Sequence, residues 1–549
     1  MTPTENSPLR TEILQSPPIT VETQEDLIRL ALAMGAAEIG GPLSQAERLL
    51  ADQATGEGRT VPGAMARRVR DAIAGGEDPL GDSFCGLRPM ALRRLAGAIF
   101  TPRELIKPML DWTISLKPER IVDAGAGSGR FSASAARANP KLSIIAVDVD
   151  PVACILTRAT LAAIGHRRSL VINADYTRWP VPSSEVTTAF IGNPPYVRHH
   201  DLSPATKAWA QTAAREIGHT ISGLAGLHAL FFLATALKGK KGDIGCFVTS
   251  SEWLDVNYGA IIRELLLTKL GGTSIHVLDP TVLPFEKTAT TAAITCFRVG
   301  EKPGTVRLRQ LKTVEELNTL SDGEPIARER LEEARRWTPL MRGKRRSPEG
   351  HVELGELCQV HRGAVTGANS TWIAQAGSVD LPEDVLFRCV TRARELFQAG
   401  PVLASADHLR CVIDLPEDLD ALSPEDRRRV ERFLQQAKML GAADGYVARY
   451  RRRWWAVHLR EPAPILTTYM ARRSPAFVRN PAGARHINIA HGIYPRQPLP
   501  EHALDRIAEA LRTVVSVFDG RTYAGGLTKF EPREVERLPV PDLPALLAP

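Results

Sequence analysis

The segment Asp123-Ala124-Gly125-Ala126-Gly127-Ser128-Gly129 joins a predicted strand, 120–123, to a predicted helix. Glycine at every second position from 125 allows a tight turn with positive φ and lets a ligand approach the backbone without Cβ atoms in the way. Arg130 stands where a dinucleotide-binding fingerprint requires its third glycine, so the GxGxxG interpretation fails. The turn suits a nucleoside ligand without a pyrophosphate, and an ordinary glycine-rich surface turn is the alternative.

Short β-branched runs alternate with helical patterns around this turn, from about residue 89 to 300. The predicted buried strands are 120–123, 143–148, 170–173, 187–191, 244–249 and 275–278. This alternation predicts an α/β fold with a doubly wound, mainly parallel sheet and helices on both faces. A last strand, 291–299, follows without a long intervening helix and is expected as a hairpin-like antiparallel edge.

Two further acids follow predicted strands and are candidate cofactor ligands. Asp148 ends the second strand, 25 residues after Asp123 (148 minus 123), where a carboxylate can accept both ribose hydroxyls of a nucleoside. Asp175 follows the third strand and can hydrogen-bond an adenine amine, although a helix cap or a turn is its structural alternative. Ligands of this fold bind at the carboxyl ends of the strands. The predicted adenosyl site therefore comprises Asp123, Gly125, Gly127, Gly129, Asp148 and Asp175.

The tetrapeptide Asn193-Pro194-Pro195-Tyr196 lies at the carboxyl end of the fourth predicted strand. An exocyclic aromatic amine is a poor nucleophile because its lone pair is delocalised into the ring. The Asn193 side-chain oxygen and the Pro194 carbonyl can accept both amine hydrogens and draw the nitrogen toward tetrahedral geometry. Proline fixes the direction of the carbonyl, and Tyr196 can stack on the base. A rigid turn that only ends the strand is the alternative.

These motifs, in this order, resemble the S-adenosylmethionine-dependent methyltransferases that act on planar nitrogen, most closely the gamma class of DNA adenine-N6 methyltransferases. The resemblance covers about residues 90–300 and, more faintly, the rest. It implies a class I methyltransferase fold, S-adenosyl-L-methionine as cofactor, no metal, and catalysis by Asn193, Pro194, Pro195 and Tyr196. The turn opens with Asp123-Ala124 where many relatives carry proline, which is a mild departure.

Two more residues are assigned by this resemblance. Phe100-Thr101-Pro102 is similar to the family's FTP segment, so Thr101 is expected to hold the methionine part of the cofactor; a helix start at Pro102 is compatible with that role. Phe285 is expected to pack on the extruded base, with a place in the core as its alternative.

The chain divides into three predicted regions. Residues 1–88 form an N-terminal helical extension, in which Thr23 and Ser44 begin capping boxes. Residues 89–300 form the methyltransferase domain. Residues 301–549 form an α+β C-terminal region that the resemblance identifies as the DNA target-recognition region, with a helix start at Ser423.

The positive charge is concentrated in one part of this C-terminal region. The net charge of the chain is +7, but the window 451–500 holds nine arginines against Glu461, a net of +8. Aromatic side chains such as Trp454 and Trp455 interleave with the arginines, a mixture suited to phosphate pairing and stacking. A solvated arginine face with both tryptophans in the core is the alternative. The candidate DNA-binding residues are Arg451, Arg452, Arg453, Arg472 and Arg473.

Composition excludes several other classes. A hydrophobic share of 44% with 24% charged residues is ordinary for a globular protein. Seven cysteines without a CxxC pair indicate neither a disulfide framework nor a zinc cluster. The N-terminus lacks a signal-peptide pattern and the longest apolar run, 227–237, is too short to span a bilayer. A cytoplasmic protein without membrane attachment is expected.

The expected function is methylation of the N6 amine of a flipped adenine in double-stranded DNA, in a restriction-modification system. No nuclease motif is evident in the sequence, so a separate restriction endonuclease is the expected partner. Methylation of an RNA base or of a protein glutamine is the alternative activity. From another class, a DNA-binding protein with a vestigial catalytic domain also stays open.

Overall fold

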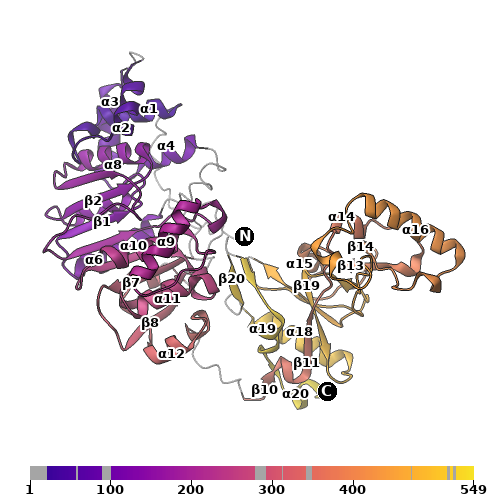
Figure 1. Cartoon of the computed structure of the whole chain (residues 1–549). Coiled ribbons are helices and arrows are strands. Elements are labelled where there is room, and N and C mark those ends of the chain that lie inside the picture. Colours follow the sequence, from indigo (N-terminus) through magenta and orange to yellow (C-terminus); the bar gives the residue numbers. More distant parts are fainter. Residues whose placement is uncertain are drawn as a thin grey trace, which may run out of the picture. The chain divides into compact units, whose positions relative to one another are not determined.

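The computed structural model describes residues 21–56, 60–88, 101–278, 292–311, 313, 315–341, 349–471, 473–515, 520–523 and 527–548 (Figure 1). The chain forms two compact units, residues 1–341 and 342–549.

Within the described residues, the first unit is built on a nine-stranded sheet of order β3-β2-β1-β4-β5-β7-β6-β8-β9. The strands are β1 Arg120–Ala124, β2 Ser143–Asp148, β3 Ser169–Asn173, β4 Thr188–Gly192, β5 Ile244–Ser250, β6 Gly272–Leu278, β7 Ala292–Arg298, β8 Thr305–Leu311 and β9 Glu324–Ala327. Neighbours among β1 to β5 all pair in parallel. The prediction of a doubly wound, mainly parallel sheet is confirmed.

The strand β7 is antiparallel, as predicted, but its predicted place at the edge is wrong. It pairs with β5 on one side and β6 on the other, with Cys246 opposite Cys296. Its side chains are buried along nearly the whole strand, which is typical of an inner strand of a sheet covered on both faces.

The sheet also continues beyond residue 300, the boundary predicted from the sequence. Strand β8 pairs in parallel with β6, and β9 pairs antiparallel with β8. In β8 buried Val306 and Leu308 alternate with exposed Thr305 and Arg307, so the strand lacks the continuous apolar run of the inner strands.

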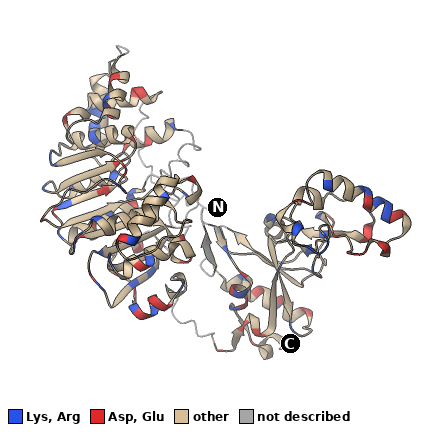
Figure 2. Cartoon of the chain, viewed as in Figure 1, with Lys and Arg blue, Asp and Glu red and all other residues tan. Residues whose placement is uncertain are grey.

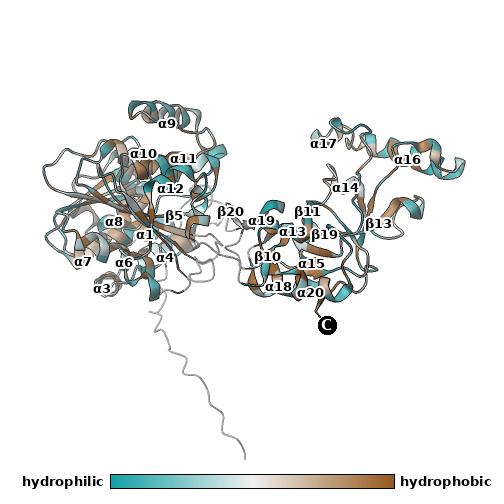
Figure 3. Ribbon diagram, turned by 90° about the horizontal axis from the view of Figure 1, so that it is seen from below, coloured by the Kyte–Doolittle hydropathy of each residue, from teal (hydrophilic) through white to brown (hydrophobic). Residues whose placement is uncertain are grey.

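Helices cover both faces of the sheet. On one face, α6 (Arg103–Ser115), α7 (Arg130–Ala138) and α8 (Pro151–Ile164) share a core with strand residues such as Ile121 and Ile144. On the other face, α9 (Pro204–Glu216), α10 (Leu227–Lys238) and α11 (Ala260–Leu267) pack against Val122 and Ile145. Figure 3 shows the resulting brown, hydrophobic layer along the strands between the helices. Alternation along each strand thus supplies both cores.

The N-terminal helices pack on α8. They are α1 (Gln24–Ala33), α2 (Gln45–Thr55), α3 (Gly63–Ala74) and α4 (Pro79–Leu87). The predicted capping boxes are present, with Thr23 and Asp26 at α1 and Ser44 and Glu47 at α2. Apolar residues of these helices share a core with Ile155 of α8, so α8 has the N-terminal helices on one side and the sheet on the other.

The second unit has an α+β structure. One four-stranded sheet, with order β11-β19-β15-β17, packs against α18 (Glu501–Val514). A second, with order β12-β14-β13-β18, packs against α16 (Pro424–Met439), whose cap is the predicted Ser423. The strands are β11 Cys358–Arg362, β12 Ile373–Ala374, β13 Leu386–Val390, β14 Arg410–Ile413, β15 Ile465–Thr468, β17 Phe477–Arg479, β18 Arg485–His486 and β19 Ala490–Pro495.

Candidate cofactor and catalytic site

The glycine turn between β1 and α7 has the predicted backbone. Gly125, Gly127 and Gly129 have φ of 75°, 58° and 86°, in the left-handed region that glycine adopts without strain. A Cβ added to Gly129 would lie 3.1 Å from Thr157 side-chain atoms, so the turn also needs glycine for its close approach to α8.

Two threonines of α8 hold the carbonyl groups of this turn. Thr157 Oγ1 donates to the Gly127 carbonyl at 2.8 Å, and Thr160 Oγ1 donates to the Ser128 carbonyl at 3.1 Å. The two threonines are three residues apart and therefore lie on the same face of the helix. The sequence prediction missed both, and only their helical spacing after Asp148 could have indicated them.

Asp148, at the end of β2, is connected to the turn. Its Oδ2 accepts a hydrogen bond from the Gly127 amide at 2.8 Å, and its Oδ1 accepts one from the Asp150 amide at 2.9 Å. Burial raises the pKa of Asp148 to about 6, although these backbone hydrogen bonds oppose the increase. Each carboxylate oxygen can accept more than one hydrogen bond, so the group retains the capacity to accept ribose hydroxyls.

Asp123 is fully buried and supports the start of α7. Its Oδ2 accepts hydrogen bonds from the Ser132 amide at 3.0 Å and the Ser132 hydroxyl at 2.6 Å. Its Oδ1 is buried and has no hydrogen-bond partner among the described residues. Burial raises the pKa of Asp123 to about 7. The contacts give Asp123 a positioning role, and its direct contact with the cofactor stays a prediction.

Asp175 follows β3 and forms a turn, which was the predicted structural alternative to an adenine contact. Its Oδ1 accepts hydrogen bonds from the Thr177 amide at 2.9 Å and the Thr177 hydroxyl at 2.7 Å. Its Oδ2 lies 3.8 Å from Arg178 Nε. The turn and an adenine contact are compatible, and the adenine contact stays a prediction.

The Asn193-Pro194-Pro195-Tyr196 turn directly follows β4 and lies against the glycine turn. A Cβ added to Gly125 would lie 3.8 Å from Pro195 Cδ and 4.0 Å from the Asn193 carbonyl oxygen. Strand β4 approaches β1 closely here, because a Cβ added to Gly192 would lie only 2.4 Å from the Ala124 carbonyl oxygen. The fold therefore brings together two motifs that are far apart in the sequence.

A buried carboxyl group that the sequence prediction missed lies near this second turn. Glu252 follows β5 and is 8% exposed, and its Oε2 has no hydrogen-bond partner among the described residues. Burial raises the pKa of Glu252, while a hydrogen bond with Tyr258 and the charge of Arg198 oppose the increase. Burial also raises the pKa of the Tyr196 phenol, and the Glu252 carboxylate raises it further. In the sequence, the position of Glu252 directly after a strand that ends at this sheet edge was the available signal for a site residue.

The remaining predicted site residues of the first unit have different outcomes. Thr101 is buried, and its carbonyl accepts a hydrogen bond from Arg130 Nη1 at 3.2 Å, so Thr101 is connected to the residue that follows the glycine turn. The role of its hydroxyl stays a prediction. Phe285 lies outside the described residues.

The arginines of the window 451–500 have different environments. Arg452 and Arg453 are exposed, Arg451 donates to the Val365 carbonyl, and Arg473 lies 3.6 Å from the centre of the Phe397 ring. Arg472 lies outside the described residues. Figure 2 shows that basic and acidic residues mix along α16.

Part of the positive charge in this window is internal to the unit. Arg479 is buried and pairs with Glu501 and Asp505, and Arg485 pairs with Glu461. The net charge of +8 therefore overstates the charge available to a partner.

The aromatic side chains also divide. Trp454 and Trp455 are half-buried and pack against a hydrophobic core, as their structural alternative predicted. Tyr446 and Tyr450 are exposed, and their ring centres are 4.9 Å apart.

No helix in the described ranges has the length and hydropathy to cross a membrane. Among the described residues there is also no group of three or more side chains placed to hold a metal ion.

The fold and the two adjoining turns define a class I S-adenosylmethionine-dependent methyltransferase. Residues 121–215 match the family described as "Methyltransferase domain", residues 188–279 match "Eco57I restriction-modification methylase", and residues 344–548 match "Type II methyltransferase M.Eco57I, C-terminal domain".

Two curated relatives extend the match to most of the chain. Type II methyltransferase M.XamI of Xanthomonas campestris pv. amaranthicola is 47% identical over 538 residues, which cover 96% of this chain and 100% of the relative. Type II methyltransferase M.AccI of Acinetobacter calcoaceticus is 21% identical over 81% of this chain and 85% of the relative. The chain therefore belongs to the type II methyltransferases of restriction-modification systems.

A solved structure has a similar fold. The type IIL restriction-modification enzyme MmeI, determined in complex with DNA, matches with a TM-score of 0.52 and 12% identity over 92% of this chain and 78% of that chain. The cofactor of this chain is S-adenosyl-L-methionine, and the glycine turn, the Asp148 carboxylate and the buried Asp123 Oδ1 fit an adenosyl and amino-acid ligand.

Proposed function

We propose that this type II DNA methyltransferase transfers the methyl group of S-adenosyl-L-methionine to the N6 amine of adenine. The observation that carries the proposal is the contact between the glycine turn and the Asn193-Pro194-Pro195-Tyr196 turn, where a Gly125 Cβ would lie 3.8 Å from Pro195. Direct transfer requires the reacting atoms to be about 3–3.5 Å apart. A cofactor held on the first turn and an amine held on the second would be neighbours, as direct transfer requires.

The second turn prepares the amine for attack. The Asn193 side-chain oxygen and the Pro194 carbonyl accept the two amine hydrogens, which localises the nitrogen lone pair toward the methyl group. Tyr196 stacks on the adenine ring, and Phe285 is proposed to pack on its other face. Bound S-adenosyl-L-methionine supplies an already activated methyl group, so the chain contributes mainly positioning.

The first turn and its neighbours hold the cofactor. Asp148 accepts the ribose hydroxyls, Asp175 accepts the adenine amine of the cofactor, and Thr101 contacts its methionine part. Gly125, Gly127 and Gly129 let the backbone approach the ligand, and Asp123 keeps α7 in place through Ser132.

The target base must leave the duplex, since its amine cannot otherwise reach the second turn. Extruding a base costs a few kcal/mol of stacking and pairing, which contacts with the DNA backbone must offset. We assign these contacts to the C-terminal unit, through Arg451, Arg452, Arg453, Arg472 and Arg473. The exposed Tyr446 and Tyr450 supply aromatic surface beside the exposed Arg452 and Arg453 in sequence.

Restriction-modification membership implies a nuclease that cuts unmodified DNA. We propose that a separate restriction endonuclease supplies this activity, because the sequence carries no evident nuclease motif. The methyltransferase would protect host DNA from this nuclease, and both proteins would act in the cytoplasm.

The test is incubation with labelled S-adenosyl-L-methionine and DNA, RNA or protein, followed by mass spectrometry of the nucleosides. Label in DNA as N6-methyladenine supports the proposal. Label in cytosine, in RNA alone or in protein alone would overturn it.

Replacing Asn193 with alanine tests the catalytic turn. The variant loses an acceptor that acts at the reacting nitrogen, and we expect a fall in kcat of about a hundredfold or more, by analogy with removal of one transition-state hydrogen bond. Its Kd for S-adenosyl-L-methionine, measured by calorimetry, should match that of the unmodified protein. Full activity in Asn193→Ala would contradict the mechanism.

A further inference from the structure

The N-terminal helices make direct contact with the glycine turn through Asp78. This residue caps α4, and its Oδ1 accepts a hydrogen bond from the Gly81 amide at 2.9 Å. Its Oδ2 accepts hydrogen bonds from Ser128 Oγ and Arg130 Nε, both at 2.5 Å. Ser128 belongs to the turn and Arg130 begins α7. One carboxylate of the N-terminal region therefore holds a residue of the glycine turn and the first residue of the helix that follows it.

The approach of α4 to the turn depends on a glycine. A Cβ added to Gly81 would lie 2.1 Å from Asp78 Oδ2 and 2.6 Å from Ser128 Oγ. No side chain fits at this position without displacing the Asp78 carboxylate. The sequence of α4 is thus adapted to this contact.

Arg130 extends the contact to the segment before β1. Its Nη1 donates to the Thr101 carbonyl at 3.2 Å, and its Nη2 lies 2.6 Å from Asp82 Oδ1. The residue that excludes a dinucleotide fingerprint therefore joins α4, the turn and the residue predicted to contact the methionine part of the cofactor.

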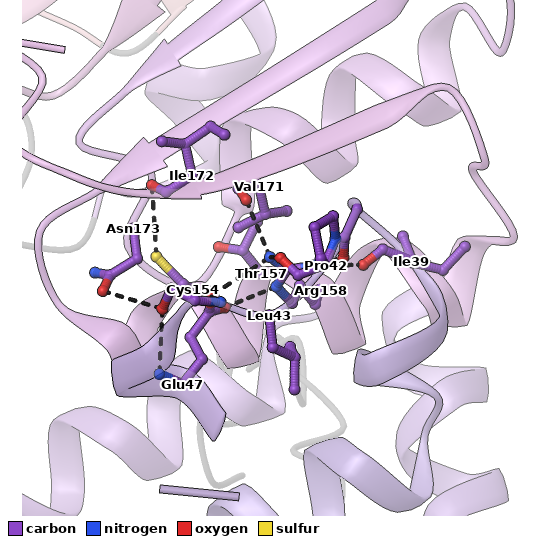
Figure 4. Close-up of polar contacts among 12 residues, drawn as sticks. Ile39, Pro42, Leu43, Glu47, Cys154, Thr157, Arg158, Val171, Ile172 and Asn173 are labelled. Atoms are coloured by element: carbon purple, nitrogen blue, oxygen red, sulfur yellow. Dashed lines mark hydrogen bonds and ion pairs between the residues drawn. The ribbon is translucent and has the colours of Figure 1, made fainter. Parts of the chain in front are cut away.

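A second attachment lies on α8, as Figure 4 shows. Arg158 Nε lies 2.7 Å from Glu47 Oε1, and both side chains are fully buried. Arg158 also donates to the carbonyl groups of Ile39, Gly41, Pro42 and Val171. Glu47 belongs to the capping box of α2, so the N-terminal region is fixed to the helix whose Thr157 and Thr160 hold the glycine turn.

We propose that Asp78 is a positioning residue for S-adenosyl-L-methionine and that the N-terminal helices set the affinity of the cofactor site. Asp78 acts through Ser128 and Arg130, by holding the turn in the conformation that binds the ligand. The proposal depends on the cofactor and not on which base is methylated. It gives the N-terminal region a role in the reaction beyond stabilising the fold.

The test is Asp78→Asn in the full-length protein. The new side-chain amide would either point its NH2 group at the donors of Ser128 and Arg130 or, with its oxygen in that place, accept their hydrogen bonds without the negative charge. We expect the Kd and the KM for S-adenosyl-L-methionine to rise by about tenfold to a hundredfold, the range of hydrogen bonds to a charged group. The kcat at saturating cofactor and the Kd for DNA should change less than about twofold, because bound cofactor restores the conformation of the turn and the turn is not a proposed DNA contact.

Asp82→Asn is the matched control, because Asp82 pairs with the same Arg130 but its side chain is 73% exposed. It should leave the Kd for the cofactor unchanged. An unchanged Kd in Asp78→Asn, or an equal rise in both variants, would overturn the proposal. A fall in kcat at saturating cofactor without a rise in KM would also overturn it.

Ser128→Ala provides a second route if Asp78→Asn folds poorly, since it removes only one hydroxyl group. It should also raise the Kd for the cofactor. In the double variant, the two effects should be less than additive, because both changes remove the same hydrogen bond. Full additivity would show that Asp78 does not act through Ser128.

Discussion

The buried pair of Glu47 and Arg158 supports a quantitative prediction for Glu47→Gln. The substitution keeps the size of the side chain but leaves the Arg158 guanidinium buried without a carboxylate. Removing one partner of a buried pair costs about 3–5 kcal/mol. Arg158 retains its hydrogen bonds to four main-chain carbonyls, which favours the lower end, about 3 kcal/mol.

The quantity to measure is the local free energy of opening of α1 and α2, by amide hydrogen exchange. Exchange is preferable to global unfolding because the chain contains two compact units, which need not unfold together. A change of about 3 kcal/mol raises the exchange rate of these helices by roughly a hundredfold when exchange follows the opening equilibrium.

Asp111→Asn is the matched control for this experiment. It removes the pair between Lys107 and Asp111, whose N–O distance of 2.6 Å is comparable but whose side chains are 80% and 59% exposed. An exposed pair four residues apart on a helix contributes about 0.3–0.5 kcal/mol. A loss below about 1 kcal/mol in Glu47→Gln, or one equal to that of the control, would refute the reasoning from burial.

Two other properties can be tested. Burial raises the pKa of Asp123 to about 7, so between about pH 4 and 7 the folded state binds a proton that the unfolded state has released. The stability of the protein without cofactor should therefore fall as pH rises through this range, and Asp123→Asn should flatten the dependence in thermal unfolding. An unchanged dependence in the variant would mean that other groups cause it. For DNA binding, replacing exposed Arg452 and Arg453 with glutamine should make the slope of log K against log salt less negative, by about 0.9 for each DNA phosphate that the variant no longer neutralises. Replacing exposed Arg432 on α16 with glutamine is the control and should leave the slope unchanged; equal slopes in all variants would exclude Arg452 and Arg453 from the interface.

The sequence predicted the parts of the fold that depend on local chemistry. Positive φ at Gly125, Gly127 and Gly129 follows from the absence of Cβ, and the capping boxes at Thr23 and Ser44 follow from side chains three residues apart. The inner parallel strands were predicted because burial on both faces makes them continuously apolar.

Interactions between distant residues could not be predicted in this way. Asp78 and Ser128 are 50 residues apart, and Asp78 has the same local pattern as any helix cap. The place of β7 between β5 and β6 is likewise a property of pairing, because its apolar sequence fits any position with two neighbours. Glu252 belongs to no motif, and apart from its position after a strand only its burial distinguishes it.

The charge of the window 451–500 shows why composition is a weaker guide than placement. Arg479 and Arg485 pair with carboxylates of their own unit and are largely buried. Arg452 also pairs with a carboxylate, that of Glu417 at 3.2 Å, but its side chain is 84% exposed, and Arg453 is exposed as well. An arginine displaces counterions from DNA only if it can reach a phosphate. The salt dependence should therefore follow the number of exposed arginines and not the net charge of the window.

Arg130 connects the sequence with the proposed role of the N-terminal helices. A third glycine at its position would permit close packing of helix and strand around a pyrophosphate. Arginine instead contacts Asp78, Asp82 and the Thr101 carbonyl, so in this chain the position attaches the turn to α4. A turn that binds an adenosyl ligand has no pyrophosphate to neutralise. Its conformation must therefore be set by the protein, and in this chain Asp78, Thr157 and Thr160 supply the hydrogen bonds that do so.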